Sequence, residues 1–215
     1  MIVSPGRNYV FVHIPKTGGT SLATALEARA MRDDILIGDT PKARKRRGRL
    51  AGIQTSGRLW KHSSLSDIEG LMPAPWMRQT FVVTLVRNPW DRMVSYYHWL
   101  RIQSFDHPAV TAAKTHDFAA FLDLAGVRAT VRAHPFGRYV RLGGQERCTL
   151  FIRLEDFASD AGPLWDHLGF RLDLPWENAA PRGRDYAQYY TVATRRIVAL
   201  LCAEDIDRFG YEFGQ

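Results

Sequence analysis

The stretch YVFVHIPKTGGTS, residues 9–21, decides the fold. Its first part, from Val10 to Ile14, is a β-branched and aromatic run that predicts a buried strand. Pro15 ends this strand because proline has no backbone N–H to give to a sheet. Two glycines follow, and the segment LATALEARAM (residues 22–31) then predicts a helix. The order is therefore strand, glycine loop, helix.

The loop between this strand and helix has the chemistry of an anion site. A glycine-rich loop lets backbone N–H groups surround an anion, and the helix N-terminus adds a partial positive charge. Lys16 adds a full charge, and Thr17, Thr20 and Ser21 add hydroxyl donors. The alternative is a tight turn with a helix cap at Thr20 or Ser21. Such a turn needs neither two glycines nor a lysine, so the residues favour the anion site.

The loop differs from the phosphate loop of nucleoside triphosphatases. That pattern has a lysine after its second glycine, followed by a Ser or Thr that binds magnesium. Here Lys16 precedes both glycines, and no GK[ST] sequence occurs in the chain. We therefore expect a site for phosphate or sulfate without a dedicated metal ligand.

A second buried strand is predicted for TFVVTLV, residues 80–86. It leads into Arg87, then Asn88, which can cap a helix, and Pro89, which suits a first helical turn. The next residues have a helical apolar spacing: Trp90, Met93, Val94, Tyr97 and Leu100. The sequence thus repeats the order of a buried strand, a turn and a helix.

The second turn can also hold an anion. The guanidinium of Arg87 can form two hydrogen bonds with a phosphate, and Ser95 lies two turns into the following helix. The alternative is a surface pair between Arg87 and Asp91 with a solvent-facing Ser95. Two anion sites flanking one crevice would fit a ligand with phosphates at both ends.

The remaining elements indicate an α/β protein. A third strand is predicted at residues 148–154, and helices at 66–72, 117–125, 155–168 and 192–209, with a loop at 107–116. Because the strands are continuous apolar runs, we expect a three-layer fold whose central, mostly parallel sheet is flanked by helices. Ligands bind such sheets beyond the carboxyl ends of the strands. We expect one domain over residues 1–215, with weakly structured loop segments at 33–59 and 126–147.

The composition fits a globular protein with a sizeable core. The chain has 215 residues, and 46% of them are hydrophobic. Its two cysteines, Cys148 and Cys202, are far apart in sequence, which favours a reducing compartment over a disulfide framework. We see no signal segment at the start and no apolar run long enough to span a membrane. These features predict a cytoplasmic protein.

The positive charge is concentrated in one segment. Residues 41–50, PKARKRRGRL, hold six basic residues, whereas the whole chain has a net charge of +7. One interpretation is a solvated loop. The other is a contact for an anionic partner such as an acidic glycan, a nucleic acid or a membrane surface.

Four segments together resemble the sulfotransferase superfamily, in particular its carbohydrate-type branch with bacterial members. They are HIPKTGGTS (13–21), FVVTLVRNPWDRMVSYYHW (81–99), FIRLEDFASD (151–160) and DYAQYYTVATRRIVALLCAEDIDRFGYEF (185–213). The resemblance is weak over residues 33–59 and 126–147. It implies a fold like that of P-loop nucleoside triphosphatases and a donor substrate, 3′-phosphoadenosine 5′-phosphosulfate (PAPS). The product would be adenosine 3′,5′-bisphosphate (PAP).

The resemblance also implies roles for single residues. Lys16 would contact the phosphosulfate and stabilise charge on the bridging oxygen. The 5′-phosphate would be held by the rest of the loop, Thr17, Gly18, Gly19, Thr20 and Ser21. Arg87 and Ser95 would bind the 3′-phosphate. No metal is implied, and we see no His, Cys or carboxylate cluster with metal-ligand spacing.

The acceptor hydroxyl must lose a proton, and a neutral histidine suits this step. We choose His62, which lies between the two motifs, where several members of the resembled family have a catalytic histidine. His13 and His98 fit packing roles better, and Lys61 can assist His62 through its charge. A late basic loop with Arg182 and Arg184 either closes over the 3′-phosphate or is solvated.

These observations predict a sulfotransferase that moves a sulfuryl group from PAPS to a hydroxyl of a glycan or small metabolite. An anionic glycan is among the candidate acceptors, and no specific nucleic-acid partner is expected. Two alternatives remain open. One is a small-molecule kinase with an atypical phosphate loop, and the other is a non-enzymatic binder of acidic polymers.

Overall fold

The computed structural model describes residues 1–174 and 185–214. The chain divides into two compact units, Met1–Val86 with Phe136–Asn178 and Arg87–Pro135 with Ala179–Gln215. The expected single domain stays a prediction.

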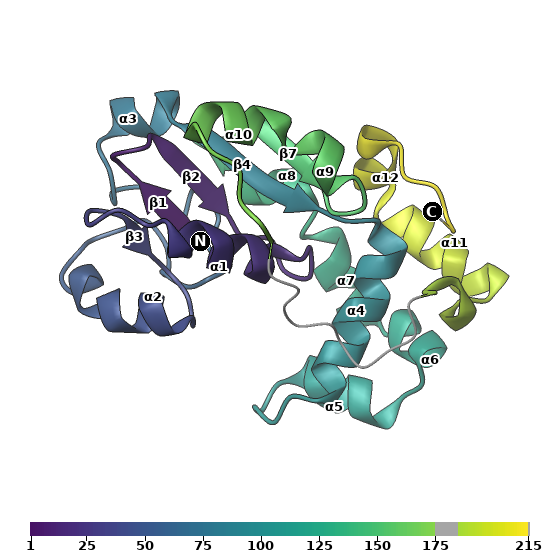
Figure 1. Cartoon of the computed structure of the whole chain (residues 1–215). Coiled ribbons are helices and arrows are strands. Elements are labelled where there is room, and N and C mark those ends of the chain that lie inside the picture. The colour runs from purple at the N-terminus through teal and green to yellow at the C-terminus, as the bar shows by residue number, and fades with distance from the viewer. Residues whose placement is uncertain (175–184, 215) are drawn as a thin grey trace. The chain divides into compact units, whose positions relative to one another are not determined.

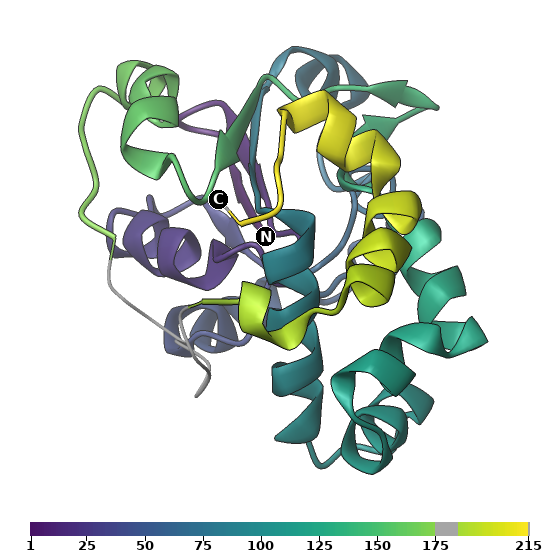
Figure 2. The same cartoon turned by 90° about the vertical axis from the view of Figure 1, so that its right-hand side faces the viewer.

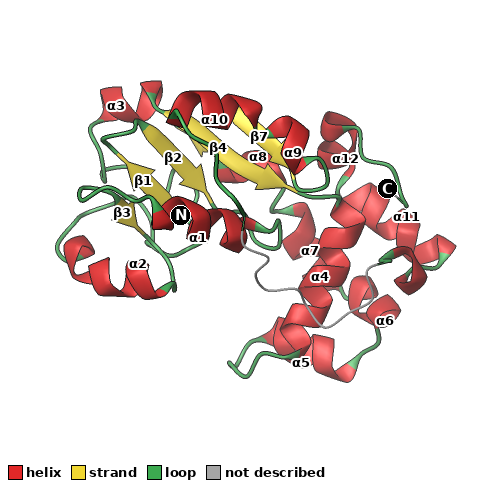
Figure 3. Cartoon of the chain, viewed as in Figure 1, coloured by secondary structure: helices red, strands yellow, loops and turns green. Residues whose placement is uncertain are grey.

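The first unit is built on a five-stranded sheet with the order β3-β1-β2-β4-β7 (Figures 1 and 3). Its strands are β1 (Ile2–Ser4), β2 (Tyr9–Val12), β3 (Ile35–Leu36), β4 (Phe81–Val86) and β7 (Leu150–Arg153). The three predicted strands are β2, β4 and β7, and they run parallel to one another. β1 pairs antiparallel with both β2 and β3. The predicted α/β fold with a central, mostly parallel sheet flanked by helices is confirmed.

Helices and a small hairpin complete the first unit. The helices are α1 (Gly19–Ala28), α2 (Pro41–Arg46), η1 (Arg47–Leu50), α3 (Ala74–Gln79), α8 (Phe136–Tyr139), α9 (Phe157–Asp160) and α10 (Gly162–Leu168). The hairpin pairs β5 (Arg141–Leu142) with β6 (Gln145–Glu146). It turns at Gly143 and Gly144, both at positive φ.

One face of the sheet forms the core with α1 and α10. Tyr9, Phe11 and Leu85 alternate toward this face, as strand side chains must, and Leu22 and Leu164 from the two helices pack against them. All five side chains are nearly or fully buried. This packing fixes α1, and therefore the loop before it, at the carboxyl end of β2.

The prediction of a loop over residues 33–59 is wrong. This segment contains β3, α2 and η1. Thr40 is the N-cap of α2, its side chain accepts a hydrogen bond from Ala43 N, and Pro41 occupies the first turn. These are helix-start signals. The basic composition of the segment is also typical of loops, and it favoured a loop over a helix.

Three further predictions in the first unit need correction. Strand β1 was missed because it is only three residues long. No helix forms at residues 66–72, where Asp67 instead accepts a hydrogen bond from Ser64 N at 2.7 Å. The helix expected at 155–168 is two helices, and Pro163 lies in the first turn of the second. Proline cannot continue the hydrogen bonds of a preceding helix.

The second unit is helical in its described part. It contains α4 (Pro89–Arg101), α5 (Pro108–Thr115), α6 (Phe118–Asp123), α7 (Ala125–Arg132), η2 (Ala187–Tyr189), α11 (Val192–Leu201) and α12 (Ala203–Phe209). Figure 2 shows the yellow-green α11 beside α4. The predicted apolar face of α4 is confirmed, since all five of its side chains are buried. Asn88 caps α4 by accepting a hydrogen bond from Trp90 N.

Several boundaries in the second unit also differ from expectation. The expected loop at residues 107–116 contains α5 (Pro108–Thr115), which His107 caps through Nδ1. Residues 126–147 contain most of α7, then α8 and the hairpin, instead of irregular chain. The helix expected over 192–209 is interrupted at Cys202, whose φ of −113° lies outside the helical region. The predicted stop at Gly210 is confirmed by its φ of 66°.

None of the helices in the described part of the chain has the length and apolar character that a membrane span requires.

Candidate active site

The loop after β2 is held in a rare backbone conformation. Lys16 has a φ of 67°, which residues other than glycine seldom adopt. The next residue, Thr17, is completely buried, and its Oγ1 donates a hydrogen bond to the Ile14 carbonyl at 2.9 Å. This buried anchor holds Lys16 in its strained conformation, a feature common at functional sites.

The two glycines of the loop are required by close packing. Gly18 has a φ of 81°, and a Cβ there would lie 2.7 Å from Leu154 Cδ1. A Cβ on Gly19 would lie 2.3 Å from His13 Cδ2. Both distances are too short for a carbon–carbon contact. The loop thus follows the path that only glycine allows at these positions.

The loop leads into the N-terminus of α1. The helix begins at Gly19, Gly18 is its N-cap without a side-chain hydrogen bond, and its first turn holds no acidic residue. Thr20 and Ser21 lie inside the first turn, so the alternative of a cap at either residue is wrong. The positive end of the helix dipole is therefore not neutralised by a carboxylate of that turn. An anion site here stays a prediction.

His62 lies against the start of this loop. Its Nδ1 is 2.7 Å from the carbonyl oxygen of His13, a residue 49 positions earlier in the chain. A carbonyl oxygen can only accept, so Nδ1 carries the proton in this bond. In the neutral ring Nε2 then holds a lone pair and can act as a base.

A short turn positions His62. Ser63 is completely buried, and its Oγ donates to the carbonyls of Arg58 and Trp60 and accepts from Trp60 N at 2.9 Å. The His62 ring meets the ring of Trp60 edge-on, with 5.1 Å between centroids, and the ring of His13 with 4.7 Å. These contacts fix the direction of the imidazole.

The surroundings keep both histidines neutral. Burial lowers the pKa of His62 to about 4, although its hydrogen bond to His13 opposes this, and the charges of Lys61 and Lys16 lower it further. Burial, with the same two lysines among the further causes, lowers the pKa of His13 well below its usual range. His13 is only 7% exposed, which confirms its expected packed position. Lys16, His13 and His62 therefore share one electrostatic environment.

In the second unit, Arg87 pairs with Asp91. Its Nε lies 2.9 Å from Asp91 Oδ2, and the side chains are 13% and 17% exposed. The alternative interpretation of this turn was a surface pair between Arg87 and Asp91. The pair is present, but its side chains are largely buried. Ser95, one turn beyond Asp91, is 5% exposed, so the solvent-facing serine of that alternative is not found. Neither observation tests phosphate binding, which stays a prediction for Arg87 and Ser95.

Strands β2 and β4 are parallel neighbours, with Val12 opposite Thr84. The loop of Lys16 follows β2, and Arg87 follows the last residue of β4. Both turns therefore start at the carboxyl edge of the sheet, where ligands of such folds bind. A crevice shared by the two turns stays a prediction.

The other candidate residues have separate positions. His98 packs edge-on against Tyr189, with 5.0 Å between ring centroids. Arg182 and Arg184 lie outside the described residues. No group of three His, Cys, Asp or Glu residues in residues 1–174 and 185–214 has the geometry to hold a metal ion.

Two features of the site were not anticipated from the sequence. Leu154, which follows β7, lies against Gly18, and the His13 carbonyl orients His62. Leu154 is the last residue of the strand predicted at 148–154, and this position is a weak signal that it lies at the carboxyl edge of the sheet. No local pattern reveals the contact between His13 and His62, because the two residues meet only through tertiary folding.

The sequence matches no family model and no curated protein. The structure is similar to that of a mouse sulfotransferase, SULT7A1, in complex with PAP. The TM-score is 0.52 and the sequence identity 18%, over 94% of this chain and 86% of the mouse chain. The chain therefore has the fold of a sulfotransferase.

Proposed function

We propose that the protein is a sulfotransferase that moves a sulfuryl group from PAPS to a hydroxyl of a glycan or small metabolite. One observation carries the proposal: at the carboxyl end of β2, Lys16 and the N-terminus of α1 adjoin a neutral, oriented His62. A cationic loop and a base are what this transfer needs. The sulfotransferase fold supports the same activity.

The two turns would grip the two ends of the nucleotide. Lys16 and the backbone N–H groups of the loop would hold the 5′-phosphosulfate, because a helix N-terminus and a cation both attract anions. Thr17 would contribute its N–H alone, since its hydroxyl already donates to Ile14. Thr20 and Ser21 would add hydroxyl donors. Arg87 and Ser95 would bind the 3′-phosphate.

His62 would act as the general base. Its Nε2 would take the proton from the acceptor hydroxyl while the acceptor oxygen forms a bond to sulfur. The bond between sulfur and the bridging oxygen of the 5′-phosphate would break in the same transfer, releasing PAP. Lys16 would stabilise the negative charge that grows on this bridging oxygen.

A thermal-shift measurement tests the nucleotide. PAP should raise the melting temperature of the protein, as any ligand of the folded state does, and ATP with magnesium should raise it much less. The reverse order would favour a small-molecule kinase. Transfer itself is tested by incubating the protein with PAPS carrying radiolabelled sulfate and a panel of glycans, lipids and phenols.

Single variants separate the two ends of the ligand. Arg87→Ala should weaken PAP about ten- to a hundredfold and leave adenosine 5′-monophosphate almost unchanged, because only PAP has the 3′-phosphate. Lys16→Ala should weaken both nucleotides. An equal loss for both nucleotides in Arg87→Ala would contradict the role of Arg87.

A further inference from the structure

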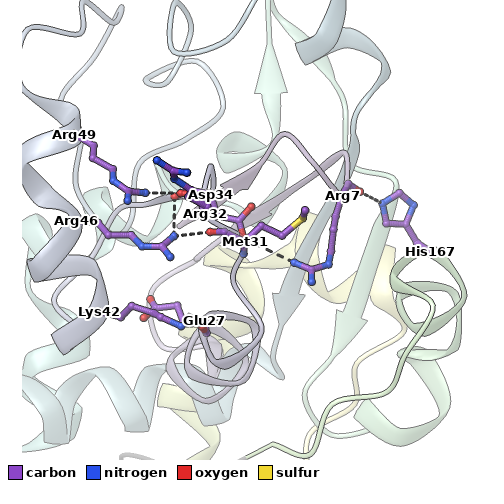
Figure 4. Close-up of polar contacts among 9 residues, drawn as sticks. All are labelled: Arg7, Glu27, Met31, Arg32, Asp34, Lys42, Arg46, Arg49 and His167. Carbon is purple, nitrogen blue, oxygen red and sulfur yellow. Dashed lines mark hydrogen bonds and ion pairs between the residues drawn. The ribbon is translucent and has the colours of Figure 1, made fainter.

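The basic segment 41–50 is divided into two sets of side chains. Figure 4 shows that Lys42, Arg46 and Arg49 point toward the end of α1 and the chain after it. Lys42 Nζ donates to the Glu27 carbonyl at 2.5 Å. Arg46 Nη1 donates to the carbonyls of Met31 and Asp34, at 2.8 and 3.1 Å.

Arg49 completes this inner set by donating to the Arg32 carbonyl at 2.6 Å. Glu27 lies in the last turn of α1, whereas Met31, Arg32 and Asp34 follow the helix, so the inner set ties α2 and η1 to the end of α1 and to the chain after it. Cations near a helix C-terminus also complement its dipole. The spacing of 42, 46 and 49 puts the three residues on one side of α2 and η1. These cations therefore already bind carbonyls of the protein, although Arg49 itself is exposed.

The outer set is Arg44, Lys45 and Arg47. All three side chains are exposed, and none of them forms an ion pair with another residue of the described part of the chain. Since like charges so close together repel one another, this surface gains free energy from an anion that neutralises it. The outer set is the part of the basic segment that is available to a ligand.

The start of α2 lies beside the turn that carries His62. Asp39, two residues before α2, pairs with Lys61 at 3.1 Å. The hydrogen bond from Lys61 lowers the pKa of Asp39, and the charges of Arg44 and Arg47 lower it further. Arg44 and Arg47 of the outer set therefore act on the same carboxylate as Lys61, the residue before His62.

An exposed aromatic ring adjoins the same point. Trp60 is 45% exposed, although its ring contacts His62. An exposed aromatic ring offers an apolar and partly polar surface on which a ligand can pack. The indole next to a base suits the apolar face of a sugar ring, while the nearby cations suit a negatively charged substituent.

We propose that Trp60, Lys61, Arg44 and Arg47 form the acceptor subsite, and that the acceptor is a glycan bearing carboxylate or sulfate groups. The inference rests on the proposed function, since His62 gives the subsite its role. Trp60 would support the sugar ring and Arg44 and Arg47 would bind its anionic groups, while Lys61, which pairs with Asp39, would offset the charge of that carboxylate. A single-stranded nucleic acid is usually held on successive stacking rings, but residues 41–50 contain no aromatic residue.

Binding of a fluorescent heparin hexasaccharide, measured by anisotropy in the presence of PAP, tests the subsite. Arg44→Ala and Arg47→Ala should each weaken binding about three- to tenfold and flatten its dependence on salt. The matched control is Arg78→Ala, an exposed arginine of α3 at the amino end of β4. Trp60→Ala should weaken binding similarly, and Trp60→Phe less.

The outcomes separate the inference from the proposed function. If Arg44→Ala and Arg47→Ala weaken the hexasaccharide no more than Arg78→Ala does, the subsite is wrong even when PAP binds. If PAP gives no thermal shift but both variants weaken the hexasaccharide, the proposed function is wrong and the anionic-glycan surface is supported. Tighter binding of a single-stranded oligonucleotide with the same sensitivity to both variants would overturn the glycan.

Discussion

At the scale of single residues, His62 is the group on which the proposed chemistry depends. Its hydrogen bond to the His13 carbonyl fixes both the tautomer and the direction of the ring. Its lowered pKa keeps it neutral, so it can accept a proton over a wide range of pH. A base with a low pKa removes a proton less readily. This property is compatible with sulfuryl transfer, because such a transfer depends mainly on stabilisation of the charge on the leaving group.

His62→Ala is expected to lower kcat by about two to four decades, the usual contribution of a general base. The affinity for PAP should stay within about twofold, because His62 is not assigned to the nucleotide. Steady-state kinetics and a PAP titration by calorimetry provide the two measurements. Full activity in this variant would show that another group takes the proton.

The pH dependence of kcat follows from the same histidine. Above its pKa of about 4 His62 is neutral and active, and below that value protonation removes the lone pair. We expect kcat to be flat from about pH 7 down to about 5 and to fall tenfold per unit below about 4. A midpoint near 6.5, the usual value for histidine, would contradict the buried environment described here.

Stability should depend on pH through this group as well. His62 has a lower pKa in the folded protein than in the unfolded chain, so the unfolded chain binds more protons between about pH 6.5 and 4. The free energy of unfolding should therefore fall as the pH is lowered through this window. Urea titrations at several pH values should show a smaller fall in the free energy of unfolding for His62→Gln. An unchanged dependence on pH in this variant would argue against the lowered pKa of His62.

The glycines of the loop allow a matched test of packing. Gly19→Ala should destabilise the protein by about 1–3 kcal/mol, because the new Cβ would lie 2.3 Å from His13 Cδ2. Gly126→Ala is the control, since Gly126 lies in α7 and has no heavy atom within 4 Å of its added Cβ. That change should be neutral or stabilising, because alanine favours a helix. Equal melting temperatures would contradict the close approach of His13.

At the scale of elements, α2 shows how one sequence feature serves two purposes. Its inner cations hold the chain after α1, and its outer cations face solvent. Arg46→Gln should destabilise the protein by about 1–2 kcal/mol, because it removes the hydrogen bonds from the guanidinium to the Met31 and Asp34 carbonyls. Arg44→Gln should change stability by less than about 0.5 kcal/mol. Urea unfolding of both variants checks the division into inner and outer cations. Equal losses of unfolding free energy in the two variants would contradict it.

The elements that the sequence predicted well have strong local signals. β2 and β4 are continuous apolar runs, and Asn88 with Pro89 marks the start of α4. The elements that were missed are short or depend on tertiary contacts. β3 has two residues and exists through its pairing with β1. α2 has a local start signal at Thr40 and Pro41, but its basic side chains bind carbonyls near the end of α1, and that contact is tertiary.

The candidate site divides in the same way. Lys16 and its glycines follow a local pattern, and the structure adds the reason for the glycines, which is contact with His13 and Leu154. The prediction of His62 as the base rests on the resemblance to sulfotransferases. Its orientation by a carbonyl 49 residues away and its lowered pKa arise from tertiary packing, which composition and spacing do not report.

At the scale of the whole molecule, the proposed nucleotide would contact residues of both compact units. Lys16 belongs to the first unit and Arg87 to the second. A ligand that binds both units stabilises each of them against local opening, whereas a ligand that binds one stabilises mainly that one. Hydrogen exchange can therefore show whether the two motifs serve a single ligand.

We expect saturating PAP to slow exchange both in the first turns of α1 and in the first turns of α4. Adenosine 5′-monophosphate lacks the 3′-phosphate and should slow α1 much more than α4. In Arg87→Ala, PAP should slow exchange in the same pattern as the monophosphate, because the 3′-phosphate of PAP no longer has the Arg87 guanidinium to bind. Protection of α1 alone by PAP in the unaltered protein would mean that Arg87 and Ser95 do not bind the nucleotide, and the second motif would then need another role.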